Sequence, residues 1–141
     1  MAISRFSKFN RSQKFTIDKD QFVQGVWLTA KDVYESDMKN FGEIKPHLLV
    51  GAWKHEFNEE SRYPGAPKYK YTLGIKIESV VKDGEIVSQL YYVNAPTFMN
   101  KDFDEICAND RLIKEINDGN CNVCPYEYES RDSIYYGFEF C

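Results

Sequence analysis

The feature that most constrains the fold is the segment KYKYTLGIKIESVV, residues 68–81, in which apolar and polar side chains alternate. This period of two residues predicts a β-strand with one face buried. Apart from Ser79, the face expected to be buried carries Tyr69, Tyr71, Leu73, Ile75, Ile77 and Val81. The opposite face carries Lys68, Lys70, Thr72, Gly74, Lys76 and Glu78.

A hairpin is expected directly after this strand. Residues 82–85, KDGE, contain the Asp-Gly pair of a tight two-residue turn, and residues 86–95, IVSQLYYVNA, then form the returning strand.

Two further strands are expected earlier in the chain. Residues 22–36, FVQGVWLTAKDVYES, are rich in Val, Trp, Thr and Tyr and predict one long strand. Residues 37–46 predict a loop with Gly42 and Pro46 as breakers. Residues 47–57 predict a second strand, in which Gly51 indicates a bulge, a bend or a close backbone approach.

The pattern changes to a helical one between residues 97 and 118, where apolar side chains recur near one helical face. Asn109 interrupts this segment and is suited to cap a second helical piece, and Gly119 is suited to end it. A closing hairpin follows, and Pro125 indicates that its first strand is an edge strand or is bulged.

The fold class expected from this order is mainly β with one helix. A helix placed before a terminal hairpin is the order of a Greek-key barrel of the oligonucleotide-binding (OB) type, although four strands before the helix exceed the minimal fold by one. The alternative is an α+β open antiparallel sheet with one covering helix. With 141 residues, we expect a flexible arm at 1–14 and a single OB-like domain at 15–141.

Charge is distributed unevenly along the chain. Residues 1–14 contain four cations and no acid, so a net charge of −4 leaves −8 for the rest. A basic arm on an acidic body indicates a polyanionic partner, an acidic neighbouring subunit or an arm that docks on its own domain. No membrane span or secretory signal is expected, and a cytoplasmic location favours reduced thiols for the four cysteines.

Metal binding and catalysis have little support in the sequence. Cys121 and Cys124 have zinc-like spacing, but Cys107, Cys141 and the two histidines do not supply a second close pair of ligands. Motifs of nucleophilic hydrolases, phosphate loops and zinc peptidases are missing as well. We therefore expect no metal, no cofactor and no enzymatic activity.

Cations and aromatic rings occur together in the pattern that single-stranded nucleic acid needs, which is a basic groove with flat faces for the bases. The same residues also fit an ordinary strand with solvated lysines and with Trp53 in the core. The residues expected to bind nucleic acid are Arg5, Lys8, Arg11, Lys14, Trp27, Lys31, Trp53, Arg62, Tyr63, Lys68, Lys70 and Lys76.

The chain resembles the small OB-fold single-stranded-DNA-binding proteins of phages and conjugative plasmids. The resemblance lies in VWLTAKDVY, LLVGAW, KYKYTLGIKI and the block VNAPTFMNKDFDEICANDRLIKEINDGN before a terminal hairpin. It implies non-sequence-specific binding of single-stranded DNA, or of RNA, during replication or transfer of a mobile element. Phe6, Phe9 and Phe15, which alternate with the cations of the N-terminal arm, separately indicate self-association through docking of the arm into a neighbouring protomer. The alternative function is a protein-interaction module, such as a phage-type inhibitor or accessory factor that binds a basic host protein.

Overall fold

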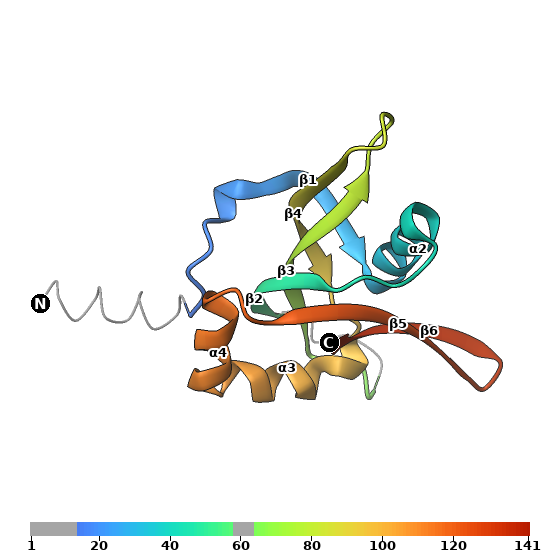
Figure 1. Ribbon diagram of the computed structural model, residues 1–141. Coiled ribbons are helices and arrows are strands. Elements are labelled where there is room, and N and C mark those ends of the chain that lie inside the picture. Colours follow the sequence, from blue (N-terminus) through green and yellow to red (C-terminus); the bar gives the residue numbers. More distant parts are fainter. Residues whose placement is uncertain (1–13, 58–63) are drawn as a thin grey trace, which may run out of the picture.

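A computed structural model describes residues 14–57 and 64–141, which form a mainly β fold (Figure 1). Five residues expected to bind nucleic acid, Arg5, Lys8, Arg11, Arg62 and Tyr63, lie outside the described residues. The strands are β1 (Phe22–Thr29), β2 (His47–Glu56), β3 (Tyr69–Val80), β4 (Ile86–Asn94), β5 (Asn122–Ser130) and β6 (Ser133–Phe140). The helices are α2 (Ala30–Phe41), α3 (Asn100–Cys107) and α4 (Asp110–Asn117), with 3-10 turns η1 (Lys19–Gln21) and η2 (Thr97–Met99).

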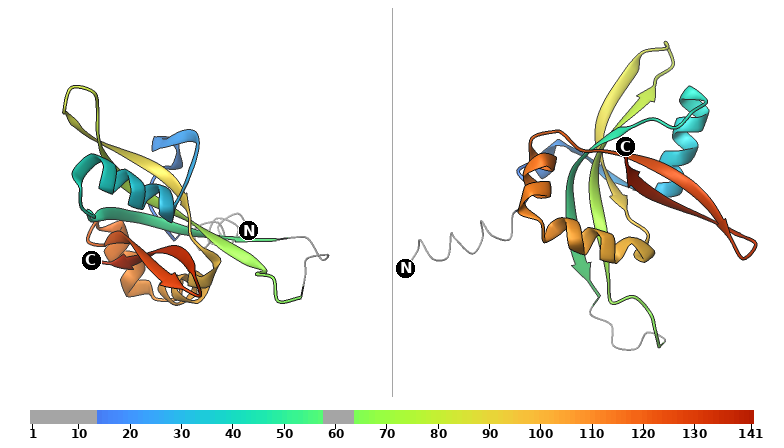
Figure 2. Two further views of the ribbon diagram at one scale, coloured as in Figure 1. Left: turned by 90° about the vertical axis from the view of Figure 1, so that its right-hand side faces the viewer. Right: turned by 60° about the horizontal axis from the view of Figure 1, so that its bottom comes forward.

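All six strands belong to one sheet in the order β1-β4-β3-β2-β5-β6, which curls into a half-barrel. Neighbouring strands are antiparallel except for β1, which runs parallel to β4. The β3–β4 and β5–β6 hairpins diverge from each other (Figure 2). Helix α2 packs on β5, β6 and β3, while α3 contacts β3 and α4 contacts β2. None of the helices in the described residues has the length and apolar character needed to span a membrane.

Most of the predicted elements are confirmed. The strands β2, β3 and β4 end within one residue of their predicted bounds, and β5 and β6 form the predicted closing hairpin. The helical segment is split at Asn109, whose side chain accepts hydrogen bonds from the first backbone N–H groups of α4. Gly119 follows α4 with a φ of 79°, as predicted for a helix end. Strand β5 pairs with β2 only at Asn122 and Val123, so Pro125 lies where β5 has no strand on that side.

The long strand predicted for residues 22–36 is wrong, because the chain turns into helix α2 at Ala30. The side chain of Thr29 accepts a hydrogen bond from the backbone N–H of Asp32, and the Asp32 side chain accepts one from the N–H of Thr29. This reciprocal capping starts the helix, and Gly42 ends it with a φ of 70°. The loop predicted for residues 37–46 is therefore half helical, and the prediction of a single helix is wrong.

Two irregularities decide which face of the sheet each side chain occupies. The register between β2 and β3 shifts between Leu49 and Gly51, which confirms the bulge as one of the structures that Gly51 indicated. The β3–β4 hairpin pairs Val80 with Ile86, and Gly84 has a φ of 79°. The backbone N–H of Val81 donates to the carbonyl oxygen of Glu85, so the loop comprises residues 82–84 and is one residue longer than the predicted two-residue turn. A shift of one residue moves a side chain to the opposite face of a strand.

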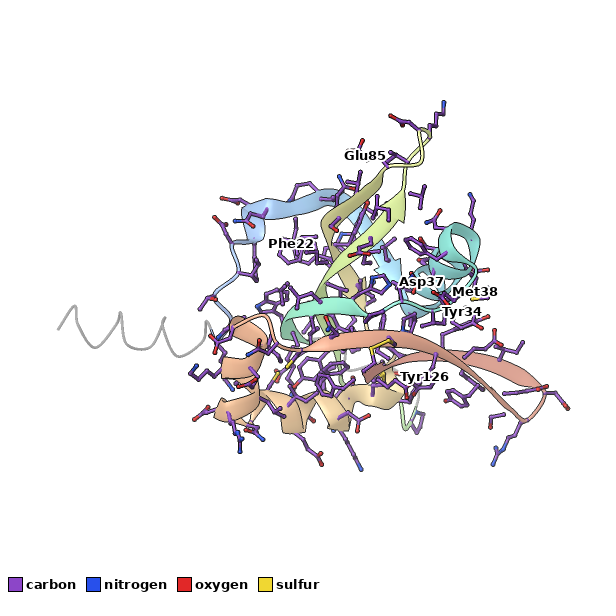
Figure 3. The ribbon with its side chains drawn as sticks, in the orientation of Figure 1. Phe22, Tyr34, Asp37, Met38, Glu85 and Tyr126 are labelled. Atoms are coloured by element: carbon purple, nitrogen blue, oxygen red, sulfur yellow. A yellow bond between two sulfur atoms is a disulfide. The ribbon has the colours of Figure 1, made fainter. Side chains whose placement is uncertain are left out.

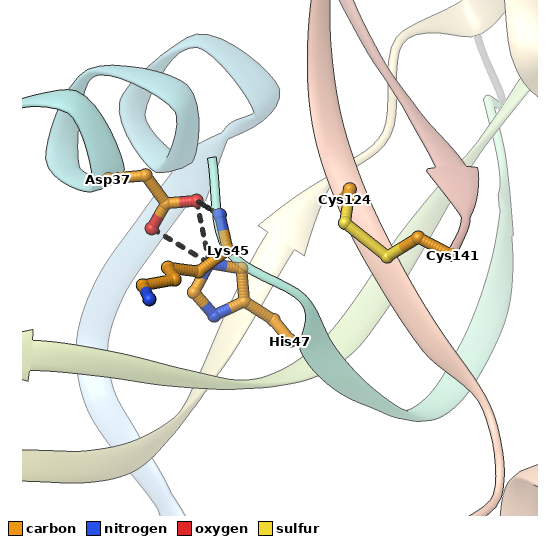
Figure 4. The surroundings of a disulfide bond; sticks show 5 residues. All are labelled: Asp37, Lys45, His47, Cys124 and Cys141. Atoms are coloured by element: carbon orange, nitrogen blue, oxygen red, sulfur yellow. Dashed lines mark hydrogen bonds and ion pairs between the residues drawn. A yellow bond between two sulfur atoms is a disulfide. The ribbon is translucent and has the colours of Figure 1, made fainter. Parts of the chain in front are cut away.

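A disulfide joins Cys124 to Cys141, with a Cα–Cα distance of 6.0 Å (Figure 4). The expectation of four reduced thiols is therefore wrong for these two cysteines, while Cys107 and Cys121 are free. The pairing follows from the closing hairpin, because the N–H of Cys141 bonds to the carbonyl oxygen of Asn122 and continues the strand pairing past β6. This brings Cys141 within the range that a disulfide can bridge.

A buried polar pair connects α2 to the start of β2. The Nε2 atom of His47 lies 2.8 Å and 2.9 Å from the two carboxylate oxygens of Asp37, and both side chains are fully buried (Figure 4). The backbone N–H of Lys45 also donates to Asp37. Among the described residues, the Nδ1 atom of His47 has no hydrogen-bond partner. The Nε2–H of His47 is therefore the natural donor to the carboxylate.

Candidate nucleic-acid interface

Aromatic and basic side chains gather on one face of the sheet formed by β2, β3, β4 and β1, which we call the outer face. It is the face opposite the core residues Leu73, Ile75 and Val93. Residues that pair directly across strands share a face, so the registers identify its members. The rows that cross it are His55–Lys70, Trp53–Thr72–Asn94, Gly74–Tyr92–Trp27 and Lys76–Leu90–Phe22.

Three aromatic rings form a stack on the outer face. Tyr92 lies 4.4 Å from Phe22 and 4.8 Å from Trp27 between ring centroids, and the ring planes are 13° and 17° apart. Tyr92 contacts both rings, and in the described chain Phe22 and Trp27 make no ring contact with each other, so Tyr92 is the middle ring. Phe22 is buried, whereas Trp27 is 55% exposed. The stack therefore ends in a tryptophan ring that is open to a further flat group.

Two glycines allow aromatic rings to lie close to the backbone of the sheet. A Cβ atom on Gly74 would lie 2.8 Å from the ring of Phe22, and one on Gly51 would lie 2.7 Å from the ring of Trp53. Glycine at these two positions lets the rings lie flat against the strands. Figure 3 shows Phe22 beside the blue stretch that leads from η1 into β1, on the side that faces the central strands. Trp53 also meets Phe22 edge to face at 6.0 Å, so it belongs to the same cluster.

The cations around the rings are Lys19, Lys70 and Lys76. The ammonium group of Lys19 lies 4.8 Å from the centre of the Trp53 ring, and that of Lys70 donates to the Asn94 side chain at 3.4 Å. Lys76 is exposed on β3. Acidic side chains are close as well, because Glu78 follows Lys76 on the same face and Lys19 lies between Asp18 and Asp20 in the sequence. Aromatic rings therefore dominate the outer face, and its net positive charge is small.

The structure brings together four of the residues that the sequence predicted to bind nucleic acid, Trp27, Trp53, Lys70 and Lys76. Lys68 is exposed just before β3. Lys31 is in the first turn of α2 rather than on a strand, and with Thr29 and Asn94 it lines an open groove beyond the end of β1. Lys14 instead donates to the carbonyl oxygen of Cys107 at 2.7 Å, at the end of α3.

Sequence reasoning missed Tyr92, Phe22 and Lys19. The signal for Tyr92 was present, because the register of the β3–β4 hairpin decides which tyrosine of the pair 91–92 faces outward. A two-residue turn would have placed Tyr92 opposite Ile75, in the core. The three-residue loop places it opposite Gly74 on the outer face. The positions of Phe22 and Lys19 depend on the parallel pairing of β1 with β4, for which the sequence carries no local signal.

A second polar cluster holds α3 against β3. The hydroxyl groups of Tyr69 and Tyr71 both donate to Asp104, the latter at 2.7 Å, and Lys54 lies 3.7 Å from this carboxylate. The hydrogen bonds from Tyr69 and Tyr71 lower the pKa of Asp104. Burial, followed by the hydrogen bond to Asp104, raises the pKa of Tyr71.

Both pKa shifts favour an ionised carboxylate that accepts hydrogen bonds from two protonated phenols. These hydrogen bonds attach α3 to β3. The prediction that Tyr71 points into the core is confirmed, because this residue is 3% exposed.

Comparison of the chain with protein-family models, with curated proteins and with solved structures finds no match. Across residues 14–57 and 64–141, no group of three His, Cys, Asp or Glu side chains is placed to hold a metal ion.

Proposed function

We propose that this protein binds single-stranded DNA without sequence preference and coats it during replication or transfer of a mobile element. The observation that carries the proposal is the Phe22–Tyr92–Trp27 stack, which ends in a tryptophan ring exposed on the outer face. Every base has a flat face, so stacking on such a ring is tolerant of sequence. Lys19, Lys70 and Lys76 lie beside the rings and are suited to phosphate groups.

The arrangement of the sheet supports the proposal. Strands β2, β3 and β4, the helical pair α3–α4 and the hairpin β5–β6 follow one another in the order expected for an OB barrel. In this interpretation β1 and α2 are additions, which accounts for the extra strand. OB folds bind oligonucleotides over their second and third strands, and these correspond to β3 and β4, the centre of the outer face.

Replacing Trp27 with alanine is expected to weaken binding of oligo-dT by about 5-fold to 150-fold, because stacking contributes about 1–3 kcal/mol per base. Fluorescence anisotropy of a labelled oligo-dT measures this change. A suitable control is Tyr128→Ala, which removes a ring that is 36% exposed on β5, where it pairs with Tyr135 of β6. Equal loss in both variants, or no binding by the unmodified chain at low salt, would refute the proposal.

The salt dependence of binding should report the few cations of the outer face. Each phosphate neutralised on a single strand contributes about −0.7 to the slope of log K against log salt concentration. The double variant Lys70→Gln with Lys76→Gln is therefore expected to make the slope shallower by about 1.4. Titrations at several salt concentrations test this, with Lys39→Gln and Lys101→Gln, exposed on α2 and α3, as the matched double control. A slope that is the same in both doubles would place the phosphate contacts elsewhere.

A further inference from the structure

An apolar groove with an acidic rim lies between the α3–α4 pair and strand β6. Its volume is about 390 Å³, and its walls include Phe103, Ile106, Leu112 and Phe140. Phe140 is 48% exposed, so part of this apolar wall is open to solvent. The side chains of Asp102, Glu105 and Glu139 also line the groove. An exposed apolar surface of this kind marks a binding site, and its carboxylates select a cationic occupant.

The N-terminal segment of this chain has the matching chemistry. Residues 5–11, RFSKFNR, alternate two phenylalanines with three cations and contain no acid. Phenylalanine rings suit the apolar walls of the groove, and arginine and lysine suit its carboxylates. Residues 5–11 therefore complement the groove both in apolar character and in charge.

The start of the described chain lies on the other side of α3 from this groove. The backbone carbonyl of Lys14 accepts a hydrogen bond from Asn117, and its ammonium group bonds to Cys107. Cys107 and Ala108 face the pocket that Lys14 lines, whereas Glu105 and Ile106 face the groove. Thirteen residues reach up to about 45 Å, so the groove of an adjacent molecule is within range.

We propose that the groove binds residues 5–11 of a neighbouring copy of this chain. Phe6 and Phe9 contact its apolar walls, and Arg5, Lys8 and Arg11 lie beside Asp102, Glu105 and Glu139. Because the donor segment and the groove are different surfaces, each copy can bind the next one head to tail. The consequence, cooperative coating of a DNA strand, rests on the proposed function, but the contact itself is measurable without DNA.

The contact is tested by sedimentation equilibrium of the full chain and two variants. The arm variant carries Phe6→Ala and Phe9→Ala and keeps every cation, while the groove variant carries Leu112→Glu at a half-buried position. The unmodified chain is expected to associate with rising concentration, and each variant should associate at least about tenfold more weakly. Mixed together, the two variants should form a one-to-one dimer, because one retains the arm and the other the groove.

The rim charges give a second test that does not depend on Leu112. Glu105→Lys with Glu139→Lys should abolish association, and Arg5→Glu with Lys8→Glu in the partner should restore it. A monomeric unmodified chain would overturn the proposal. A mixture of arm and groove variants that stays monomeric would also overturn it, because the arm of one copy would then not bind the groove of another. Binding of a short oligo-dT by single copies is measured alongside. If the unmodified chain did not bind oligo-dT, the proposed function would be refuted, while the result on association between copies would still hold.

Discussion

Replacing Asp37 with alanine is expected to lower the free energy of unfolding by about 3–5 kcal/mol, because removing one partner of a buried pair leaves the other unpaired. Asp37 is fully buried and accepts hydrogen bonds from His47 and from the backbone of Lys45. Alanine would leave both donors without an acceptor in a site that water does not reach. Urea unfolding followed by circular dichroism measures the loss.

The control is Glu35→Ala on the same helix, an exposed position where a change of no more than about 0.5 kcal/mol is expected. The double variant Asp37→Leu with His47→Phe should recover part of the stability, since an apolar pair of similar volume removes the unpaired imidazole. The backbone N–H of Lys45 still lacks its acceptor in this variant, so recovery should be incomplete. A loss below about 1 kcal/mol in Asp37→Ala would contradict this account of the pair.

Replacing Phe22 with alanine should affect both stability and binding. Phe22 is 3% exposed and stacks directly under Tyr92, so its removal is expected to cost about 3–5 kcal/mol of unfolding free energy. It also removes the support of the Tyr92–Trp27 pair, and the affinity for oligo-dT should fall about as far as in Trp27→Ala. Urea unfolding and anisotropy titration of the same preparation separate the two effects.

Phe22→Leu is the matched control, because it keeps an apolar side chain at this position without a flat ring. We expect it to recover part of the lost stability, while the affinity for oligo-dT stays low. If Phe22→Leu restored full affinity, the stacked arrangement would not be what positions Trp27.

The sequence predicted the parts of the fold that depend on local signals. Alternation identified β3, the Asp-Gly pair identified the hairpin after it, and Asn109 identified the break between α3 and α4. Helix α2 also had local signals, the Thr29–Asp32 capping pair and Gly42, but the β-branched and aromatic residues around them favoured a strand. The parallel pairing of β1 with β4 joins segments far apart in the sequence, and no pattern within either strand predicts it.

The candidate site was predicted in part for the same reason. The sequence predicts that Trp27 and Trp53 lie in strands. It does not predict that they lie on the same face of the sheet. A bulge in β2 and an extra loop residue after β3 bring Trp53 and Tyr92 to one side, and both depend on how the strands pair. Lys31 and Trp27 both fall in the strand predicted for residues 22–36, but Lys31 lies in helix α2, which is why the structure separates them.

The bulge at Gly51 gives β2 one residue more than a regular pairing with β3 needs. Leu49 before the bulge and Ala52 after it both face the core, whereas Trp53 faces outward. Deleting Val50 or Gly51 would remove the bulge and leave Leu49 and Ala52 facing the core and Trp53 facing outward, because the remaining residue would pair with Gly74 as in a regular strand. Strand β3 pairs with β4 without such an extra residue, so a deletion there would turn the side chains beyond it to the opposite face. Related chains that lack one residue at the bulge would therefore keep the same surface chemistry.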